Sequence, residues 1–363
     1  MIKSWTYLGE YQRLKEEILK AVQGVFDSGR LILGERVAGF ERNFADYCGR
    51  AFGIGVNSGT DALFLALKAL GVGPQDEVIT VANTAVPTVA AIRATGARPV
   101  FVDIVSETYL MDVRQVESRI TPKTKVVLPV HLYGQAVAMD RLLAITQPRG
   151  IKMVEDCAQA HGCLYRGKRV GSFGEISAFS FYPTKILGAY GDAGMCVTDS
   201  PGLAQRLRQL RMYGMKQEYY SHIEGYNSRL DEVQAAILDV KLKYLEEFIT
   251  GRQRIAQFYD EALKGLLVTP VIGEGSSHTY YLYVVRHPER DRIIADLKKE
   301  GVEVGIHFPH PIHLMEAYRF LEYRAGDLPV TERAAKEIFS LPIYPDLSEE
   351  ELETIVTALK KVV

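Results

Sequence analysis

Apolar residues along the first two-thirds of the chain recur with helical spacing in some stretches and with strand-like spacing in others. From Tyr11 to Phe26 they fall three or four positions apart, which predicts an amphipathic helix that ends at Ser28-Gly29. Short apolar runs follow at 51–56, 77–81, 99–104, 125–130, 151–156, 175–181 and 195–199, with helical segments such as 61–70 and 85–95 between several of them. This alternation predicts an α/β fold whose mostly parallel sheet is covered by helices on both faces.

The pattern changes after Asn227. Residues 231–265 keep helical spacing throughout, which predicts one long helix, and an alternating segment at 279–286 precedes helices at 291–301 and 350–363. We therefore predict a large domain over residues 1–245, including the N-terminal segment, and a smaller C-terminal α+β domain over residues 246–363. A length of 363 residues suits two domains of about 150 residues each.

Charge and composition narrow the class of protein. The formal net charge of −2 gives no reason to expect nucleic acid or an anionic membrane as a partner. The N-terminus is mixed and charged, and no run of 18 apolar residues occurs, so we expect a cytoplasmic protein without a membrane span. The four cysteines fit no common metal or redox spacing, and we predict buried thiols and no metal site.

The first segment with candidate chemistry is Asn57-Ser58-Gly59-Thr60, which lies between the predicted strand 51–56 and the helix that follows it. Free backbone N–H groups and the positive end of the helix dipole make such a turn a natural phosphate site. Gly59 allows close approach of the backbone, and the Thr60 hydroxyl can add a donor. A plain capped helix is the alternative interpretation.

Asp156 ends the apolar run 151–156, where a carboxylate is costly unless it has a cationic or hydrogen-bonded partner. The protonated ring nitrogen of a pyridine cofactor is one such partner. An N-cap for the next turn is the alternative.

Lys185 lies four residues beyond the buried run 175–181, in a loop that Pro183 and Gly188 keep irregular. Ligands bind at the carboxyl ends of the strands in open α/β sheets, and a lysine held there can condense with an aldehyde. An exposed lysine is the plain alternative for Lys185. The plain alternative for Asn227, which precedes the next long helix, is a solvated N-cap.

Five motifs, taken in order, resemble one known family. NSGTDAL (57–63), VHLYGQ (130–135), EDCAQAHG (155–162), SFYPTK (180–185) and GYNSRLDEVQAAIL (225–238) are similar to those of the DegT/DnrJ/EryC1 sugar aminotransferases. FERNFADYCG, GIHFPHPIHL and SLPIYPDLS extend the resemblance to nearly the whole chain. The resemblance implies the fold-type I architecture of pyridoxal-phosphate (PLP) enzymes and a homodimer with shared active sites.

The resemblance also implies a role for individual residues. Lys185 matches the lysine that bonds to the cofactor and moves the proton, and Asp156 matches the partner of the ring nitrogen. The other implied contacts are Gln159 beside the phenolic oxygen, Gly59, Thr60 and Ser180 at the phosphate, Asn227 from the neighbouring subunit, and Tyr182 and His307 in the sugar pocket.

The substrates implied are L-glutamate and a keto nucleotide sugar. At positions Tyr182 and Asp192 the sequence looks more like the family members that aminate C3 of a dTDP-3-keto-6-deoxyhexose. Amination at C4 is the alternative. Lys185 disfavours a sugar dehydratase, which carries histidine there. Lys185, Asp156 and Gln159 together disfavour a regulatory protein without turnover. A Rossmann dehydrogenase is excluded because no G-x-G-x-x-G follows the first strand.

One position departs from the family pattern. Ala85 stands where many relatives have an aromatic residue that stacks on the cofactor ring. We expect the missing stacking to weaken cofactor binding by about 1 kcal/mol.

Overall fold

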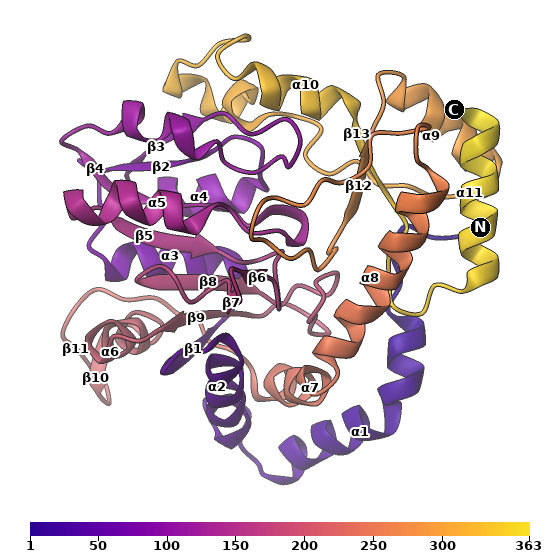
Figure 1. The fold of residues 1–363 in the computed structure, drawn as a ribbon. Coiled ribbons are helices and arrows are strands. Elements are labelled where there is room, and N and C mark those ends of the chain that lie inside the picture. Colours follow the sequence, from indigo (N-terminus) through magenta and orange to yellow (C-terminus); the bar gives the residue numbers. More distant parts are fainter.

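A seven-stranded sheet lies at the centre of the computed structural model, which describes residues 1–363 (Figure 1). Its strands are β1 (Phe52–Val56), β2 (Glu77–Val81), β3 (Arg98–Val102), β4 (Thr124–Val127), β5 (Lys152–Asp156), β8 (Ile176–Ser180) and β9 (Gly194–Thr198). They lie in the order β1-β9-β8-β5-β4-β2-β3, and only the pairs that contain β9 are antiparallel. The predicted α/β fold is confirmed, and the other six strands all end at the same edge of the sheet.

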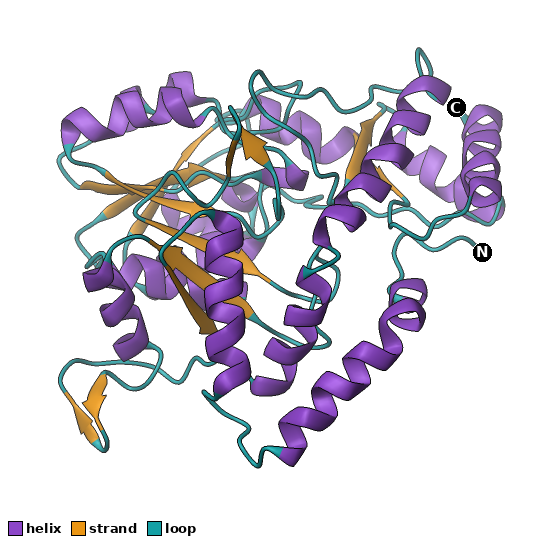
Figure 2. Cartoon of the chain, turned by 60° about the horizontal axis from the view of Figure 1, so that its bottom comes forward, coloured by secondary structure: helices purple, strands orange, loops and turns teal.

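Helices cover the sheet on both faces, as the turned view makes clear (Figure 2). The helices of this part of the chain are α1 (Leu8–Asp27), α2 (Glu35–Cys48), α3 (Gly59–Ala69), α4 (Val86–Ala94), α5 (Met139–Thr146), α6 (Pro201–Leu210) and α7 (Glu232–Leu242). Because both faces are covered, every residue of β8 and β9 is buried. This burial explains why these strands are almost continuously apolar in the sequence.

The C-terminal part packs around its own small core. It contains α8 (Leu245–Ala262), α9 (Arg290–Lys299), α11 (Glu349–Val362) and the antiparallel pair β12 (Tyr283–Arg286) and β13 (Ile338–Leu341). Tyr259, Tyr283 and Phe339 lie in a hydrophobic cluster separate from the cluster of the large sheet. Two short hairpins, β6 (Leu164–Tyr165) with β7 (Lys168–Arg169) and β10 (Met215–Gln217) with β11 (Tyr220–Ser221), complete the strands. None of the helices is long and apolar enough to cross a bilayer.

One segment of the C-terminal part returns to the large sheet. Helix α10 (Pro329–Glu337) begins where the buried Asp103, just beyond β3, accepts hydrogen bonds from the backbone N–H groups of Val330 and Thr331, each at 2.9 Å. Ile312 and Leu328 join a small cluster with Phe101 of β3. The change from one core to the other falls within α8, because Leu245 packs in the core of the large sheet and Ile255 packs in the small core. The returning segment also crosses between the two cores, and the boundary at residue 245 stays a prediction.

The single long helix predicted over 231–265 is wrong. The chain leaves helical geometry at Tyr244, where φ is −105° and ψ is 3°, so that α7 and α8 are separate helices. Helix α7 packs against α1 and α2, whereas α8 runs toward the small domain (Figure 1). The helix breaks at Tyr244 because its two halves pack against surfaces that lie in different directions. No glycine or proline near Tyr244 marks the break in the sequence.

The strand predicted over 279–286 begins only at Tyr283. Tyr280 has a φ of 49°, which does not continue a strand. The buried Arg252 of α8 donates hydrogen bonds from Nη1 to the carbonyls of Tyr280, Tyr281 and Ile343 at 3.1, 3.3 and 2.8 Å. The carbonyls of 280 and 281 are thus engaged by a side chain rather than by a neighbouring strand.

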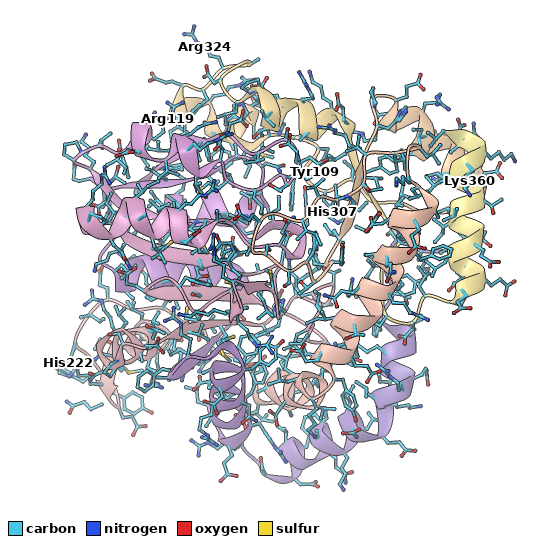
Figure 3. All side chains as sticks on the ribbon, viewed as in Figure 1. Tyr109, Arg119, His222, His307, Arg324 and Lys360 are labelled. Carbon is cyan, nitrogen blue, oxygen red and sulfur yellow. The ribbon has the colours of Figure 1, made fainter.

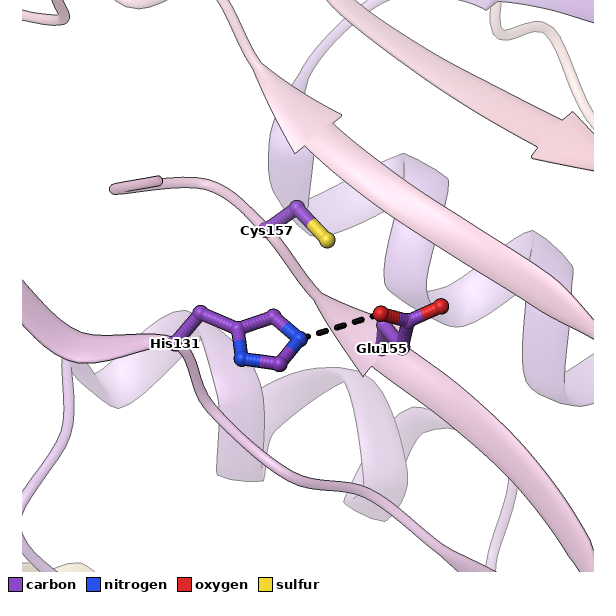
Figure 4. Close-up of side chains that lie close together, drawn as sticks. All are labelled: His131, Glu155 and Cys157. Atoms are coloured by element: carbon purple, nitrogen blue, oxygen red, sulfur yellow. Dashed lines mark hydrogen bonds and ion pairs between the residues drawn. The ribbon is translucent and has the colours of Figure 1, made fainter. Parts of the chain in front are cut away.

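Strand β5 is fixed by the buried carboxylate of Glu155 (Figure 4). It accepts five hydrogen bonds, from the backbone N–H groups of Gly171, Phe173 and Gly174, from Ser177 Oγ and from His131 Nε2. His131 Nδ1 accepts from Val137 N–H at 3.1 Å, which leaves the ring proton on Nε2. Cys157 Sγ lies within 4.8 Å of both ligand atoms, but His131 and Glu155 are already committed to protein partners, and the three form a structural cluster.

The Glu155 cluster gives a testable dependence of stability on pH. Burial acts to raise the pKa of Glu155, but the hydrogen bonds from His131 and from the backbone donors outweigh it and lower the pKa from 4.5 to about 2. A carboxylate with a lowered pKa stabilises the fold fully above its ordinary pKa, and this contribution is lost as the pH falls toward the folded value.

We therefore expect Glu155→Gln to lower the free energy of unfolding at pH 7 by roughly 2–4 kcal/mol, because its amide NH₂ faces donors. Urea denaturation at a series of pH values measures this. The difference from the wild type should narrow below pH 4.5. The exposed Glu117 provides the control, since Glu117→Gln should change little at any pH. A pH-independent difference for Glu155→Gln would contradict the assignment.

Candidate active site

A cavity of about 230 Å³ opens at the edge where β1, β5 and β8 end. Seven of the nine residues that the sequence predicts for the site line it: Gly59, Thr60, Asp156, Gln159, Ser180, Tyr182 and Lys185. The cavity also receives Asp192 and Ala193 at the start of β9, and Ala85, Pro87 and Thr88 of α4 and the turn before it. Residues up to 135 positions apart, Ser58 and Ala193, are thus brought together by the common direction of the strands.

One wall of the cavity is the amino end of α3. Ser58 caps this helix by accepting a hydrogen bond from Asp61 N–H at 3.1 Å, and the N–H groups of Gly59 and Thr60 have no partner within the helix. Gly59 packs so closely on Ser180 that an added Cβ would come within 2.5 Å of the serine Cβ. Two free N–H groups, the Thr60 and Ser180 hydroxyls and the helix dipole therefore make a site for a phosphate.

Asp156 lies at the end of β5 and is 3% exposed. Its carboxylate accepts one hydrogen bond from Thr88 Oγ1 at 2.9 Å and one from Ala158 N–H at 3.1 Å. Burial raises the pKa of Asp156, and these two hydrogen bonds and the charge of Lys185 oppose the increase. A buried carboxylate with only two donors has room for a further, cationic donor inside the cavity.

The orientation of the Gln159 amide follows from a backbone contact. Its Oε1 accepts a hydrogen bond from Tyr133 N–H at 2.9 Å, so the Nε2 group is the one left to donate into the cavity. Tyr133 itself has a φ of 60°, a strained value for a residue with a side chain. Strain of this kind is typical of functional sites, and here it accompanies the contact that sets the amide of Gln159.

Lys185 is half-buried on a tightly folded loop between β8 and β9. Its own N–H donates to the Tyr182 carbonyl at 2.8 Å, and an added Cβ on Gly188 would meet the Pro183 carbonyl oxygen at 2.4 Å. The loop is also held from outside, because the buried ammonium of Lys241 on α7 donates to the Gly188 carbonyl. The position of Lys185 is thus determined by the packing of the loop.

Two predicted residues do not line the cavity. His307 lies at the junction of the two domains (Figure 3), where its Nδ1 contacts Ser340 Oγ at 2.8 Å. Burial, helped by the charge of Lys185, lowers the pKa of His307 to about 4, so the ring is neutral at pH 7. Asn227 is exposed and does not line the cavity, although the next residue, Ser228, accepts from Asn57 N–H at 3.1 Å and donates to Asp61 at 2.7 Å beside the amino end of α3.

The sequence interpretation missed several residues in and beside the cavity, and three of them bear on its chemistry. Thr88 hydrogen-bonds to Asp156 and belongs to the segment NTAVPT (83–88). Its spacing of four residues from Thr84, with which it also hydrogen-bonds, is the signal that could have identified it. Ala158 follows Asp156 by two residues and lines the cavity. Tyr281, whose ring lies beside the Lys185 amine, comes from a distant segment, and no local pattern marks it.

The chain matches the DegT/DnrJ/EryC1/StrS aminotransferase family over residues 12–360. It is 50% identical to dTDP-3-amino-3,4,6-trideoxy-alpha-D-glucose transaminase from Micromonospora megalomicea subsp. nigra, covering 99% of this chain and 98% of that protein. It is also 45% identical to a pleiotropic regulatory protein from Geobacillus stearothermophilus, covering 96% of this chain and 94% of the relative.

Solved structures of two relatives have the same fold. DesV from S. venezuelae, in complex with a ketimine intermediate, superposes with a TM-score of 0.97 at 42% identity, over 99% of this chain and 98% of DesV. NtdA from Bacillus subtilis, with its cofactor PMP bound, gives a TM-score of 0.89 at 32% identity, over 96% of this chain and 81% of NtdA. On this agreement of motifs, site and fold, the chain belongs to the DegT/DnrJ/EryC1/StrS aminotransferase family, whose enzymes depend on pyridoxal phosphate.

Proposed function

We propose that this protein transfers the amino group of L-glutamate to the keto group of a nucleotide-linked sugar, a dTDP-3-keto-6-deoxyhexose. The observation that carries the proposal is that Lys185 and Asp156 line one cavity whose wall is the phosphate site at Gly59-Thr60. The choice of C3 is supported by the 3-amino sugar in the name of the Micromonospora relative.

The residues of the cavity fit pyridoxal phosphate. Asp156 has room for the protonated ring nitrogen, the Gln159 Nε2 group can donate to the phenolic oxygen, and the amino end of α3 can hold the phosphate. When bound, the cofactor supplies an aldehyde for the amino group and a ring that accepts electrons from the reacting carbon.

Lys185 has two tasks in this proposal. Its amine would hold the cofactor between turnovers, and the free amine would carry the proton away from the Cα of the amino donor. Asp156 keeps the proton on the ring nitrogen, because loss of that proton would leave the buried carboxylate without its cationic partner. The second half of the reaction uses the same residues in reverse order, with the keto sugar as acceptor.

We further propose a homodimer in which Asn227 of each subunit reaches the phosphate site of the other. The exposure of Asn227 and its absence from the lining of its own cavity support this arrangement. Large apolar side chains are exposed along α1 and just after it, at Leu8, Leu19, Phe26 and Leu31. Apolar surface of this kind is typical of an interface between subunits.

A regulatory role is the second candidate, and the name of the Geobacillus relative favours it. A protein that acts only by binding has no need of the cavity in which Lys185, Asp156 and Gln159 meet. Turnover therefore distinguishes the two candidates.

The first test is the replacement of Lys185. We expect Lys185→Ala to lower the rate of amino transfer by about 10³-fold or more, because both the covalent anchor and the proton carrier are lost. Borohydride reduction of the loaded protein, followed by peptide mass spectrometry, should locate the cofactor on Lys185 in the wild type and on no residue in the variant. Lys298→Ala, at an exposed position on α9, is the matched control and should behave as the wild type. Cofactor found on another lysine would contradict the assignment.

The substrate is tested with a panel of 3-keto and 4-keto nucleotide sugars and glutamate as the donor. We expect an amino sugar from a dTDP-3-keto-6-deoxyhexose, detected by mass spectrometry. Product from 4-keto sugars alone would overturn the choice of C3, and no product from any of them would favour the regulatory role.

Ala85 offers no aromatic side chain to stack on the ring of the proposed cofactor, and this gives another prediction. Ala85 lines the cavity in an extended conformation, with φ −66° and ψ 143°, which an aromatic residue also adopts. We expect Ala85→Phe to tighten cofactor binding about five-fold through stacking. Equilibrium titration with the cofactor measures this. Val86→Phe is the control, because Val86 is exposed and does not line the cavity. Equal effects of both variants would show that general hydrophobicity, not stacking, is responsible.

Mixed dimers test the proposed role of Asn227. Lys185→Ala and Asn227→Ala subunits, mixed and allowed to exchange, should recover about a quarter of the wild-type activity. Half of the dimers are then hybrids, and each hybrid contains one site with both an intact lysine and an intact partner asparagine. If Asn227 instead served its own subunit, mixing would restore nothing beyond the sum of the two variants.

A further inference from the structure

The ring of Tyr281 lies beside the amine of Lys185. Lys185 Nζ is 4.5 Å from the centre of this ring, within the range of a cation–π contact. Tyr281 is 8% exposed, so the contact is largely removed from water. The Tyr281 hydroxyl also lies 3.1 Å from Oγ1 of Thr184, the residue before the lysine. Tyr281 therefore contacts both the lysine and the loop that carries it.

The backbone of Tyr281 is fixed from two sides. Its carbonyl accepts a hydrogen bond from the buried Arg252 at 3.3 Å. On the other side, Gly134 packs so closely that an added Cβ would meet Tyr281 N at 2.9 Å. The ring thus has little freedom to follow the lysine if the lysine moves.

Neighbouring tyrosines at this junction face different cores. Tyr281 belongs to the core of the large sheet, whereas Tyr280 belongs to the core of the small domain and stacks on His278 at 4.0 Å between ring centres. Both are largely buried, with exposures of 8% and 6%. Tyr280 is therefore a matched comparison that lacks the contact with Lys185.

We propose that Tyr281 is a positioning residue that holds the protonated amine of Lys185 whenever this amine is not bonded to the cofactor. A freed lysine carries its charge in a partly buried place, and a charge there needs a partner. A carboxylate would bind the ammonium firmly and could take its proton. An aromatic face attracts the ammonium more weakly and accepts no proton, so the lysine stays close to the cofactor and free to return. This inference rests on the assignment of Lys185 in the proposed function.

The experiment uses the full chain loaded with pyridoxamine phosphate, the form in which Lys185 is free. Position 281 is replaced by phenylalanine and by phenylalanines with one, two or three ring fluorines, which progressively weaken the negative face of the ring at nearly constant shape. The rate at which Lys185 reacts with a small acylating reagent at pH 7 is followed by peptide mass spectrometry. We expect it to rise about three- to ten-fold along the series, because a weaker ring holds the amine less firmly and leaves it free to react.

The same series at Tyr280 is the control and should leave the acylation of Lys185 unchanged. A rate that does not depend on fluorine at position 281, or that rises equally at position 280, would overturn the proposal. Tyr281→Phe separates the hydroxyl from the ring, and an effect confined to this first step would assign the role to the Thr184 contact instead. Thermal unfolding of each variant verifies the fold. Because acylation needs no turnover, the result can be interpreted even if no keto sugar is aminated.

Discussion

Two buried carboxylates on consecutive residues of β5 need partners, and the protein meets this need in opposite ways on the two faces of the strand. Glu155 accepts five hydrogen bonds from the chain itself, so it has no capacity left. Asp156, one residue on and facing the other way, accepts only two. The first carboxylate is part of the framework, and the second is kept available for a ligand.

The site is assembled around Asp156 by the shared direction of the strands. The Gly59-Thr60 turn after β1, Asp156 at the end of β5 and the Lys185 loop after β8 meet because these strands run the same way. Residues outside the cavity then set the fine geometry: Lys241 holds the loop at Gly188, and the ring of Tyr281 lies beside the amine. Segments that follow the cavity residues in the sequence therefore help to determine where the lysine amine lies.

Local patterns in the sequence predicted the seven strands of the large sheet and marked candidate residues at their ends. Asp156, Gly59 and Lys185 each follow an apolar run, and a strand end in an open sheet is the place where a ligand binds. The break at Tyr244 could not be predicted in this way, because it follows from α7 and α8 packing in different directions. Tyr281 is 96 residues from Lys185, and only tertiary packing brings the two together.

The position of β1 at the edge of the sheet has a consequence for the order in which the chain folds. Its one partner in the sheet is β9, which follows the lysine loop in the sequence and pairs Phe52 with Thr198. The closure of so long a loop is slow, and the pairing cannot begin during synthesis before Gly194, the partner of Val56, has emerged. The turn after β1, which we propose to bind the phosphate, is therefore among the first parts of the site to be synthesised and among the last to be fixed in place.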